Sequence, residues 1–308
     1  MSSVGGLILL LALGGLLYWL SLVLWTVRAL SRLPRQTYAS AVARGRPGEP
    51  SELDTPLGFV QTTISRAGRE LSVWDVEGLR PNGPVAIVTH GWGSGKVNAL
   101  VRMPLLASIC SRVLLWDQPG HGESAGVCTL GTAEVEDLLR IIEEAGADRS
   151  LVLCGSSMGA GVSIAAAART DRVDLVIAEA PYCLARTPAR NVMRSRRAPV
   201  ALNLSPALCV IGWRGMGRWT GPGLSMSKSE PFDRAMLASR LACPLVVLHG
   251  DADTTCPPAD GQAIARACPQ GRFVEISGGT HRNLWKEPAC RATMEREYTT
   301  AIGSIADA

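Results

Sequence analysis

The pattern of hydrophobic and polar positions divides the chain into three parts. Residues 4–27 form an apolar run of twenty-four residues without a charged side chain, which is long enough to cross a hydrocarbon core of roughly 30 Å as a helix. Residues 28–57 are rich in Arg, Pro, Gly and Ala and show little apolar periodicity, so we expect a linker there. Residues 58–308 carry the repeating pattern of a folded domain.

Within this domain, the pattern changes from alternating to continuous apolar segments. Residues 58–65 and 69–76 alternate polar and apolar side chains and predict a β-hairpin. Residues 132–145 predict an amphipathic helix with a threonine cap, which ends before Gly146. Such segments alternate with buried strands, which predicts an α/β fold with a mostly parallel central sheet and helices on both faces. The predicted strands are PVAIVTHG, VLLWDQPG, LVLCGSS, LVIAEAP, LVVLHGD and FVEISGG.

The interval between the fourth and fifth of these strands is much longer than one crossover requires. Residues of about 183–240 therefore predict an inserted cap. Within it, residues 184–230 hold seven arginines and one lysine against a single acidic residue. These charges are either a solvated surface or a basic face held near anionic lipid headgroups or an acidic substrate, and both readings stay open.

The apolar N-terminal run predicts a retained, single-pass membrane anchor. A cleaved signal peptide is the alternative, but it needs a basic segment ahead of a shorter apolar core, and residues 1–4 carry no basic side chain. Arg28, Arg32 and Arg35 follow the run on its C-terminal side. Because positive charge accumulates on the cytoplasmic side of membranes, we expect the main domain to lie in the cytoplasm.

Composition and charge exclude several classes of protein. The nine cysteines form no CxxC pair, so the sequence suggests neither a disulfide framework nor a zinc site, and it fits a reducing compartment. A net charge of +4 is too small to indicate nucleic-acid binding, and there is no glycine-rich phosphate loop or aromatic RNA-binding motif.

The motif GSSMG at 155–159 is the first candidate for chemistry. It follows a predicted strand and opens a helix rich in small residues, as a nucleophile elbow requires, with Ser157 at its centre. A serine hydroxyl needs a base within hydrogen-bond reach. Of the four histidines, His281 is the one that leaves room for an acid between the serine and itself, in the chain order Ser, acid, His.

The acid should stand in the loop that follows LVVLHG. Asp253 is the first choice and Asp251 the second, although either aspartate could merely cap the next turn. The backbone amides of Met158 and Trp92 are the candidates for an oxyanion hole, because each follows a strand at the expected site. A thiol nucleophile at Cys154, or a metal site at the two aspartates, would lack the necessary partners.

These motifs resemble those of the α/β-hydrolase superfamily, in the group related to serine aminopeptidases and lysophospholipase-like hydrolases. The resemblance implies the triad Ser157, Asp253 and His281, and it treats Asp117 and His121 as structural. It implies no cofactor and no metal. One departure is Cys256, which stands where the family often has an aliphatic residue. The stretches that carry the resemblance are HGW at 90–92, DQPGHGES at 117–124, GSSMG at 155–159, HGDADTTCPP at 249–258 and GGTH at 278–281.

We therefore expect a membrane-anchored serine hydrolase that cleaves an ester or thioester with an apolar acyl part, such as that of a lipid-like substrate. An amide or peptide hydrolase and an acyltransferase are alternatives with the same fold. An alternative of another class is a non-catalytic protein that binds a lipid or a partner. Acyl length, head group and oligomeric state do not follow from the sequence.

Overall fold

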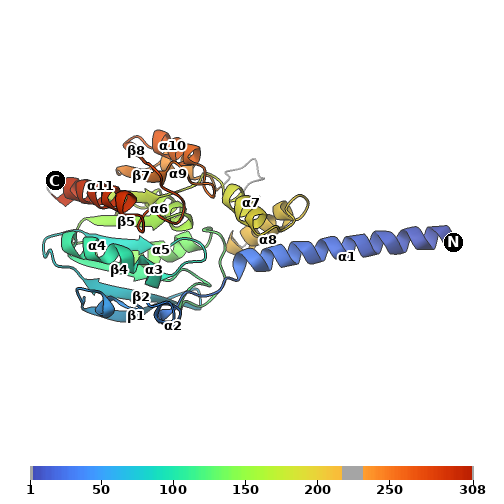
Figure 1. Ribbon diagram of the computed structural model, residues 1–308, viewed down its shortest axis with the longest axis horizontal. Helices are drawn as coiled ribbons and strands as arrows, with labels where there is room; N and C mark the ends of the chain where they lie inside the picture. Colours follow the sequence, from blue (N-terminus) through green and yellow to red (C-terminus); the bar gives the residue numbers. More distant parts are fainter. Residues whose placement is uncertain (1–2, 217–231, 307–308) are drawn as a thin grey trace.

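The computed structural model describes residues 3–216 and 232–306. Eight strands form one sheet in the order β1-β2-β4-β3-β5-β6-β7-β8, and β3 to β8 run parallel to one another (Figure 1). The predicted mostly parallel α/β sheet is thus confirmed. The strands are β1 (Phe59–Arg66), β2 (Arg69–Glu77), β3 (Val85–Thr89), β4 (Arg112–Trp116), β5 (Leu151–Ser156), β6 (Leu175–Glu179), β7 (Leu245–Gly250) and β8 (Gly271–Ile276).

The predicted hairpin is the antiparallel edge of this sheet. β1 pairs with β2, and Arg66 stands opposite Arg69. Ala67 and Gly68 between them both have positive φ, at 49° and 70°, as a two-residue turn that matches the strand twist requires. β2 in turn pairs antiparallel with β4, so the hairpin lies at one end of the sheet, next to the parallel strands.

Successive side chains of each central strand point to opposite faces of the sheet. Helices cover both faces and bury both sets of side chains. In β5, for example, Val152 and Cys154 belong to one hydrophobic cluster and Leu151 and Leu153 to the other. The first face is covered by α3 (Lys96–Ala99), the 3-10 turn η2 (Leu100–Arg102), α4 (Met103–Ile109) and α11 (Pro288–Ala306). The second is covered by α5 (Glu134–Glu144), α6 (Met158–Ala167), α9 (Arg234–Ala238) and α10 (Pro258–Ala267).

The helix predicted for residues 132–145 is α5, but its start differs from the prediction. Its N-cap is Ala133, not a threonine. The buried carboxylate of Glu134 instead accepts hydrogen bonds from the backbone N–H groups of Thr129 and Gly131, and these bonds hold the preceding turn. Gly146 follows the helix with φ 84°, as the sequence predicts.

The N-terminal helix α1 (Ser3–Ser31) projects from the globular part and ends beside two cap helices, α7 (Arg186–Ser195) and α8 (Leu204–Met216). Val23, Val27 and Leu30 on its last turns are buried in a third hydrophobic cluster with the cap. Trp19 Nε1 donates a hydrogen bond to the carbonyl oxygen of Leu202 at 3.0 Å. The last turns of α1 are therefore part of the folded domain.

The predicted linker and the predicted cap both contain helices. Residues 28–57, which the sequence suggests as a linker, contain the end of α1, the helix α2 (Tyr38–Val42) and the 3-10 turn η1 (Pro50–Glu52). Most of the predicted cap is described, and it lies between β6 and β7. Its residues 217–231, which include part of the predicted basic cluster, lie outside the described residues.

Candidate active site

Ser157 lies at a sharp turn between β5 and α6. Its backbone has φ 53° and ψ −112°, a combination that residues other than glycine rarely adopt. The glycines on either side permit the close packing of this turn. A Cβ atom at Gly159 would lie 2.1 Å from the carbonyl oxygen of Thr89, and one at Gly155 would lie 2.5 Å from that of Gly159. The turn therefore has the strand–serine–helix form expected of a nucleophile elbow.

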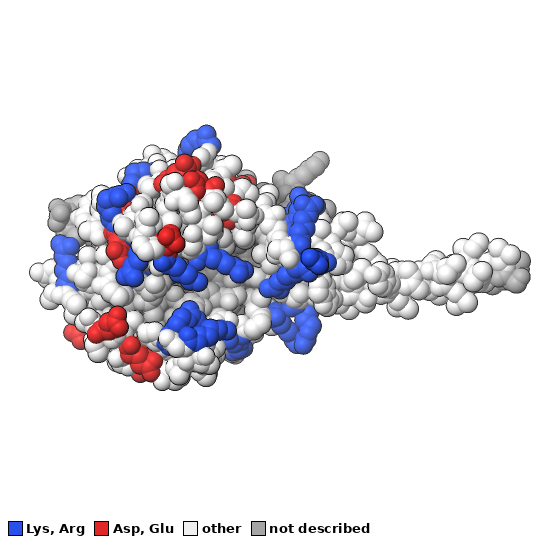
Figure 2. All heavy atoms as spheres, in the orientation of Figure 1, with Lys and Arg blue, Asp and Glu red and all other residues white. Residues whose placement is uncertain are grey.

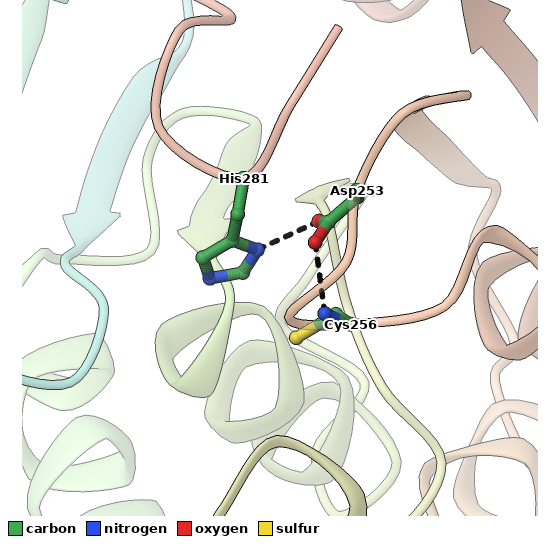
Figure 3. A group of neighbouring side chains, drawn as sticks. All are labelled: Asp253, Cys256 and His281. Atoms are coloured by element: carbon green, nitrogen blue, oxygen red, sulfur yellow. Dashed lines mark hydrogen bonds and ion pairs between the residues drawn. The ribbon is translucent and has the colours of Figure 1, made fainter. Parts of the chain in front are cut away.

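The structure brings together the three residues that the sequence selects for a triad. His281 follows β8, and its Nε2 lies 3.0 Å from Ser157 Oγ. Its Nδ1 lies 2.7 Å from Asp253 Oδ2, in the loop after β7 (Figure 3). Both distances are within hydrogen-bond reach. One imidazole thus joins a serine hydroxyl to a buried carboxylate, as nucleophile activation by a general base requires.

Asp253 is held firmly in its loop. Its Oδ1 accepts hydrogen bonds of 2.8 Å from the backbone N–H groups of Thr255 and Cys256. Burial by itself would raise the pKa of Asp253, but hydrogen bonds from His249 and His281 outweigh it and hold that pKa well below its usual value. Asp251, the second choice, is exposed and accepts from the N–H of Gly278. The described contacts therefore join His281 to Asp253.

Cys256 completes a group with Asp253 and His281 whose potential metal-ligand atoms lie within 4.8 Å of one another. Burial raises the pKa of the Cys256 thiol well above its ordinary value, so the protonated form, a weak ligand, is favoured. The Asp253 oxygens are already engaged with the imidazole and two amides. Hydrogen bonds among these residues are enough to explain why the three side chains lie close together.

The two residues whose amides are proposed for the oxyanion hole both belong to segments next to Ser157. Met158 is the first residue of α6, so its N–H has no partner within the helix. The loop after β3 approaches from the other side, because a Cβ atom at Gly91 would lie 3.3 Å from Ser157 Cβ. Trp92, the next residue, lines the same cavity as Ser157. Its Nε1 donates to the carbonyl oxygen of Leu30 at 2.9 Å, which ties this loop to the end of α1.

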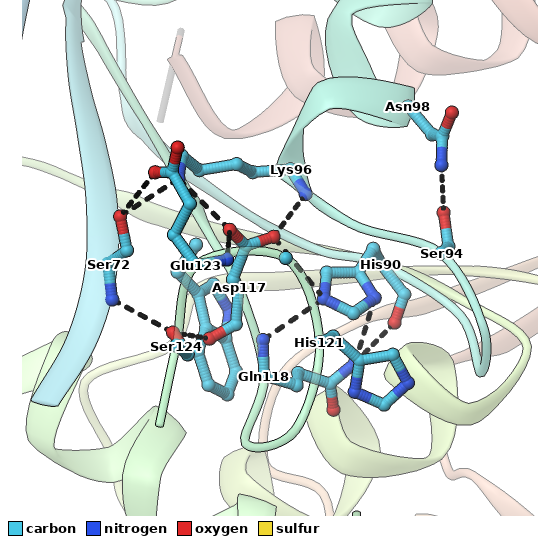
Figure 4. Close-up of polar contacts among 12 residues, drawn as sticks. Ser72, His90, Ser94, Lys96, Asn98, Asp117, Gln118, His121, Glu123 and Ser124 are labelled. Carbon is cyan, nitrogen blue, oxygen red and sulfur yellow. Dashed lines mark hydrogen bonds and ion pairs between the residues drawn. The ribbon is translucent and has the colours of Figure 1, made fainter. Parts of the chain in front are cut away.

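Buried polar side chains support the same loop (Figure 4). His121 Nε2 accepts from the N–H of Gly93 at 3.1 Å. Asp117 accepts from the N–H of Lys96 at 2.7 Å and pairs with its ammonium group at 2.9 Å. Burial, and then the neighbouring His90, lower the pKa of His121 to about 3, so its ring stays neutral and keeps an acceptor. These contacts agree with the structural role that the resemblance implies for Asp117 and His121.

A second buried network, which the sequence reasoning missed, lies behind the serine. Glu179 ends β6, and its backbone carbonyl accepts from the N–H of Ser157 at 2.8 Å. Its carboxylate forms an ion pair with Arg102 and accepts from Trp285 Nε1 at 2.8 Å and from the Tyr298 hydroxyl at 2.6 Å. A charged residue at the carboxyl end of a buried strand is the one signal that could have pointed to it.

Ser157 and His281 open into a cavity of about 1110 Å³. Leu30 of α1 lines this cavity, as do Tyr182 and Ala189 of the cap region. The cavity is large enough for a substrate with an extended apolar part. The N-terminal helix therefore contributes directly to the wall of the candidate active site.

Comparisons with solved structures place the chain among proteins of one fold. An esterase of Pyrococcus furiosus is 16% identical, with a TM-score of 0.67, over 90% of this chain and 98% of that one. An esterase of a Rhodococcus species is 18% identical, with a TM-score of 0.58, over 80% and 99%. The thioesterase domain of the curacin biosynthetic pathway is 18% identical, with a TM-score of 0.54, over 79% and 99%. At these identities the likeness shows the fold.

The sequence comparisons identify the family. No curated protein matches the chain. The model of the alpha/beta hydrolase family matches residues 85–289, which include the strand β3, the elbow and the loop of His281. This match covers more than half of the chain, and the fold agrees with it. The chain therefore belongs to the alpha/beta hydrolase family.

Proposed function

We propose that the protein is a membrane-anchored serine hydrolase that cleaves an ester or thioester through a triad of Ser157, His281 and Asp253. The observation that carries this proposal is the hydrogen-bonded series from Ser157 Oγ through the imidazole to Asp253. It stands at the wall of a large cavity, where a substrate carbonyl could reach the serine.

The proposed reaction is acyl transfer to water. His281 Nε2 accepts the proton of Ser157 Oγ as the oxygen attacks the carbonyl carbon, and Asp253 stabilises the imidazolium that forms. The amides of Met158 and Trp92 stabilise the negative oxygen of the tetrahedral intermediate. His281 then protonates the leaving group, and the acyl-enzyme forms. In the second half, His281 deprotonates a water molecule, which releases the acid and restores the serine. The mechanism uses no cofactor and no metal.

The proposed anchor is α1, and its surface supports a membrane location. One described helix, Val4–Ser31, is long and apolar enough to cross a membrane. Its first half exposes large apolar side chains, and Leu10 and Leu11 are each 68% exposed; lipid would cover such a surface. The cap lies beside the last turns of this helix. A lipid-like ester could therefore pass from the bilayer to the cavity.

The orientation follows from the arginines after the apolar run. Arg28, Arg32 and Arg35 stand at the C-terminal side of the anchor, so we propose that the catalytic domain faces the cytoplasm. Reporter fusions at the C-terminus test this. Activity of a reporter that works only outside the cytoplasm would overturn the orientation and leave the proposed chemistry in place.

The central experiment is labelling of the full-length protein with a fluorophosphonate, which reacts with activated serines. We expect the unchanged protein to label, and Ser157→Ala and His281→Ala to fail to label. Ser163→Ala is the matched control, because Ser163 is buried in the same helix and does not line the cavity. Hydrolysis of short and long p-nitrophenyl esters then measures turnover.

The alternatives predict different results. A folded protein that neither labels nor hydrolyses any of the esters would favour the non-catalytic binding protein. An amide hydrolase or an acyltransferase would label at Ser157 as well, because it shares the acyl-enzyme. Either of these would be indicated by turnover of amides, or by transfer to an added alcohol, that exceeds ester hydrolysis.

A further inference from the structure

The lining of the active-site cavity is rich in cationic side chains. Six cationic side chains line it against two carboxylates, Asp54 and Glu179, and Glu179 is already paired with a cation. The cationic side chains are those of Arg44, Arg46, Arg102, Arg282, Lys286 and Arg291. The cavity that holds the proposed nucleophile therefore carries an excess of cationic side chains in its lining.

Four of these cations have no carboxylate partner among the described residues. Arg102 pairs with Glu179, and Arg291 with Glu295. The remaining four, which we call the rim cations, form no ion pair within the described part of the chain, and all four are exposed to solvent. They are Arg44, Arg46, Arg282 and Lys286.

Elsewhere on the described part of the protein, some basic side chains form ion pairs and others, such as Arg80 and Arg149, form none. Arg66, Arg112, Arg140, Arg169 and Arg272 each form an ion pair with an acidic side chain. Figure 2 shows basic side chains gathered across the middle of the visible face and around the base of the long helix. Unpaired cations on a concave surface raise the local concentration of anions, because low-dielectric walls focus their field.

The segment that carries two of the rim cations is well held. The Tyr38 hydroxyl donates to Glu52 at 2.6 Å, and the N–H of Gly48 donates to the same carboxylate at 2.8 Å. Arg44 itself donates to Gln36 Oε1 at 2.7 Å and to the carbonyl oxygen of Ser40 at 3.1 Å, and a guanidinium has five N–H donors, so others remain for a ligand. Arg44 and the backbone that carries Arg46 are therefore held in place, which lowers the cost of binding an anion there.

Another part of the cavity lining is apolar. The cavity lining includes Leu30, Leu130, Tyr182, Ala185 and Ala189, and all of them belong to the cluster that α1 forms with the cap. Val101 and Trp285, which also line the cavity, pack in or against the cluster on the first face of the sheet instead. Ser157 and His281 line the same cavity. An amphiphile could thus place its chain against these apolar residues and a polar group near the rim cations.

We propose that the substrate is an ester or thioester with an apolar chain and an anionic group, either a phosphate or a carboxylate, and that the rim cations bind this anionic group. The chain lies against α1 and the cap. This proposal rests on the proposed hydrolase function, and it names the class of substrate for that same site. The anionic group stands on the leaving group if it is a phosphate ester of the alcohol, or on the acyl chain if it is a terminal carboxylate.

Two matched pairs of substrates test the proposal on full-length protein in a neutral detergent. The first pair is 1-octanoylglycerol and its 3-phosphate, which differ by a phosphate on the leaving group. The second is 4-nitrophenyl octanoate and the mono-4-nitrophenyl ester of octanedioic acid, which differ by a carboxylate on the chain. We expect kcat/KM to favour the anionic member of one pair by roughly tenfold or more at low salt. High salt should reduce that preference, because it screens exposed charges.

The variant Arg46→Gln, Arg282→Gln, Lys286→Gln removes three of the rim cations, and none of these side chains forms a hydrogen bond or ion pair with the described residues. We expect its preference for the anionic member to fall to near one, mainly through KM. The charge-conserving variant Arg46→Lys, Arg282→Lys, Lys286→Arg should keep most of the preference. A control with the same change in charge, Arg80→Gln, Arg149→Gln, Arg266→Gln, lies outside the cavity and should leave the preference unchanged.

The outcomes separate this proposal from the hydrolase function. If the unchanged protein hydrolyses both members of each pair equally, the anion site is wrong and the hydrolase stands. If the glutamine variant keeps its preference but loses binding to anionic vesicles, the rim cations contact the membrane and the proposal fails. If nothing is hydrolysed, the hydrolase function fails, and binding to Ser157→Ala decides the anion site. Octyl phosphate should then raise its melting temperature more than octanol does, and the glutamine substitutions should abolish this difference.

Discussion

Replacing Asp253 with asparagine should switch the imidazole of His281 into the wrong tautomer. Asp253 Oδ1 accepts from two backbone N–H groups at 2.8 Å, so the asparagine carbonyl oxygen will take that place. Its NH₂ group will then stand where Oδ2 now lies, 2.7 Å from His281 Nδ1. An NH₂ group donates, so Nδ1 must accept and the proton must move to Nε2. A protonated Nε2 cannot accept the proton of Ser157.

The size of this effect follows from the role of the acid in a triad. Loss of the correct tautomer lowers kcat by about 10⁴, equivalent to about 5 kcal/mol of transition-state stabilisation. The assay is kcat on a short p-nitrophenyl ester, with melting temperature by circular dichroism to show that the near-isosteric variant folds. Asp251→Asn is the matched control, since Asp251 bonds to Gly278 instead. A folded Asp253→Asn protein within tenfold of the original kcat would refute the assigned role of Asp253.

Three further predictions test the support of the site. Gly159→Ala places a Cβ 2.1 Å from the Thr89 carbonyl oxygen, so we expect the unfolding free energy to fall by about 1–3 kcal/mol and activity to fall with it. An unchanged melting temperature would contradict the packing argument. Trp92→Phe removes the donor to the Leu30 carbonyl and should lower the unfolding free energy, measured in urea, by about 1–3 kcal/mol. We expect kcat to fall by more than KM changes, and a variant as stable as the original would show that this bond is not needed. Burial holds the pKa of His121 at about 3 in the folded state, below its unfolded value, so the unfolded state binds more protons between those values. The stability that neutral His121 contributes is present above a pH of about 6.5 and falls by up to about 1.4 kcal/mol per pH unit below it. Between pH 7 and pH 4.5, urea unfolding should show a smaller loss of unfolding free energy for His121→Gln than for the unchanged protein. An equal loss in the two proteins would contradict this assignment.

The network of Glu179 and Arg102 illustrates what the sequence could not reveal. The two residues are 77 positions apart, and each is an ordinary charge in its own segment. Their pairing depends on β6 and the turn before α4 meeting behind the elbow. The rim cations pose the same difficulty, because they come from the segment after α2 and from the loop after β8, whereas the sequence draws attention to the basic residues of the cap.

Local pattern and motif order by themselves determined the sheet, the elbow at Ser157 and the identity of its partner histidine. Each depends on short stretches with a required spacing: continuous apolar strands, small residues around a strained turn, and an imidazole after the last strand. The tertiary structure supplied the contact of the imidazole with Asp253, the aspartate that the resemblance favours, because the loop after β7 buries Asp253 and leaves Asp251 exposed. It also decided which side of α1 is buried. That helix is apolar all round, so its sequence marks no inner face, and only packing against the cap places Leu30 in the wall of the cavity.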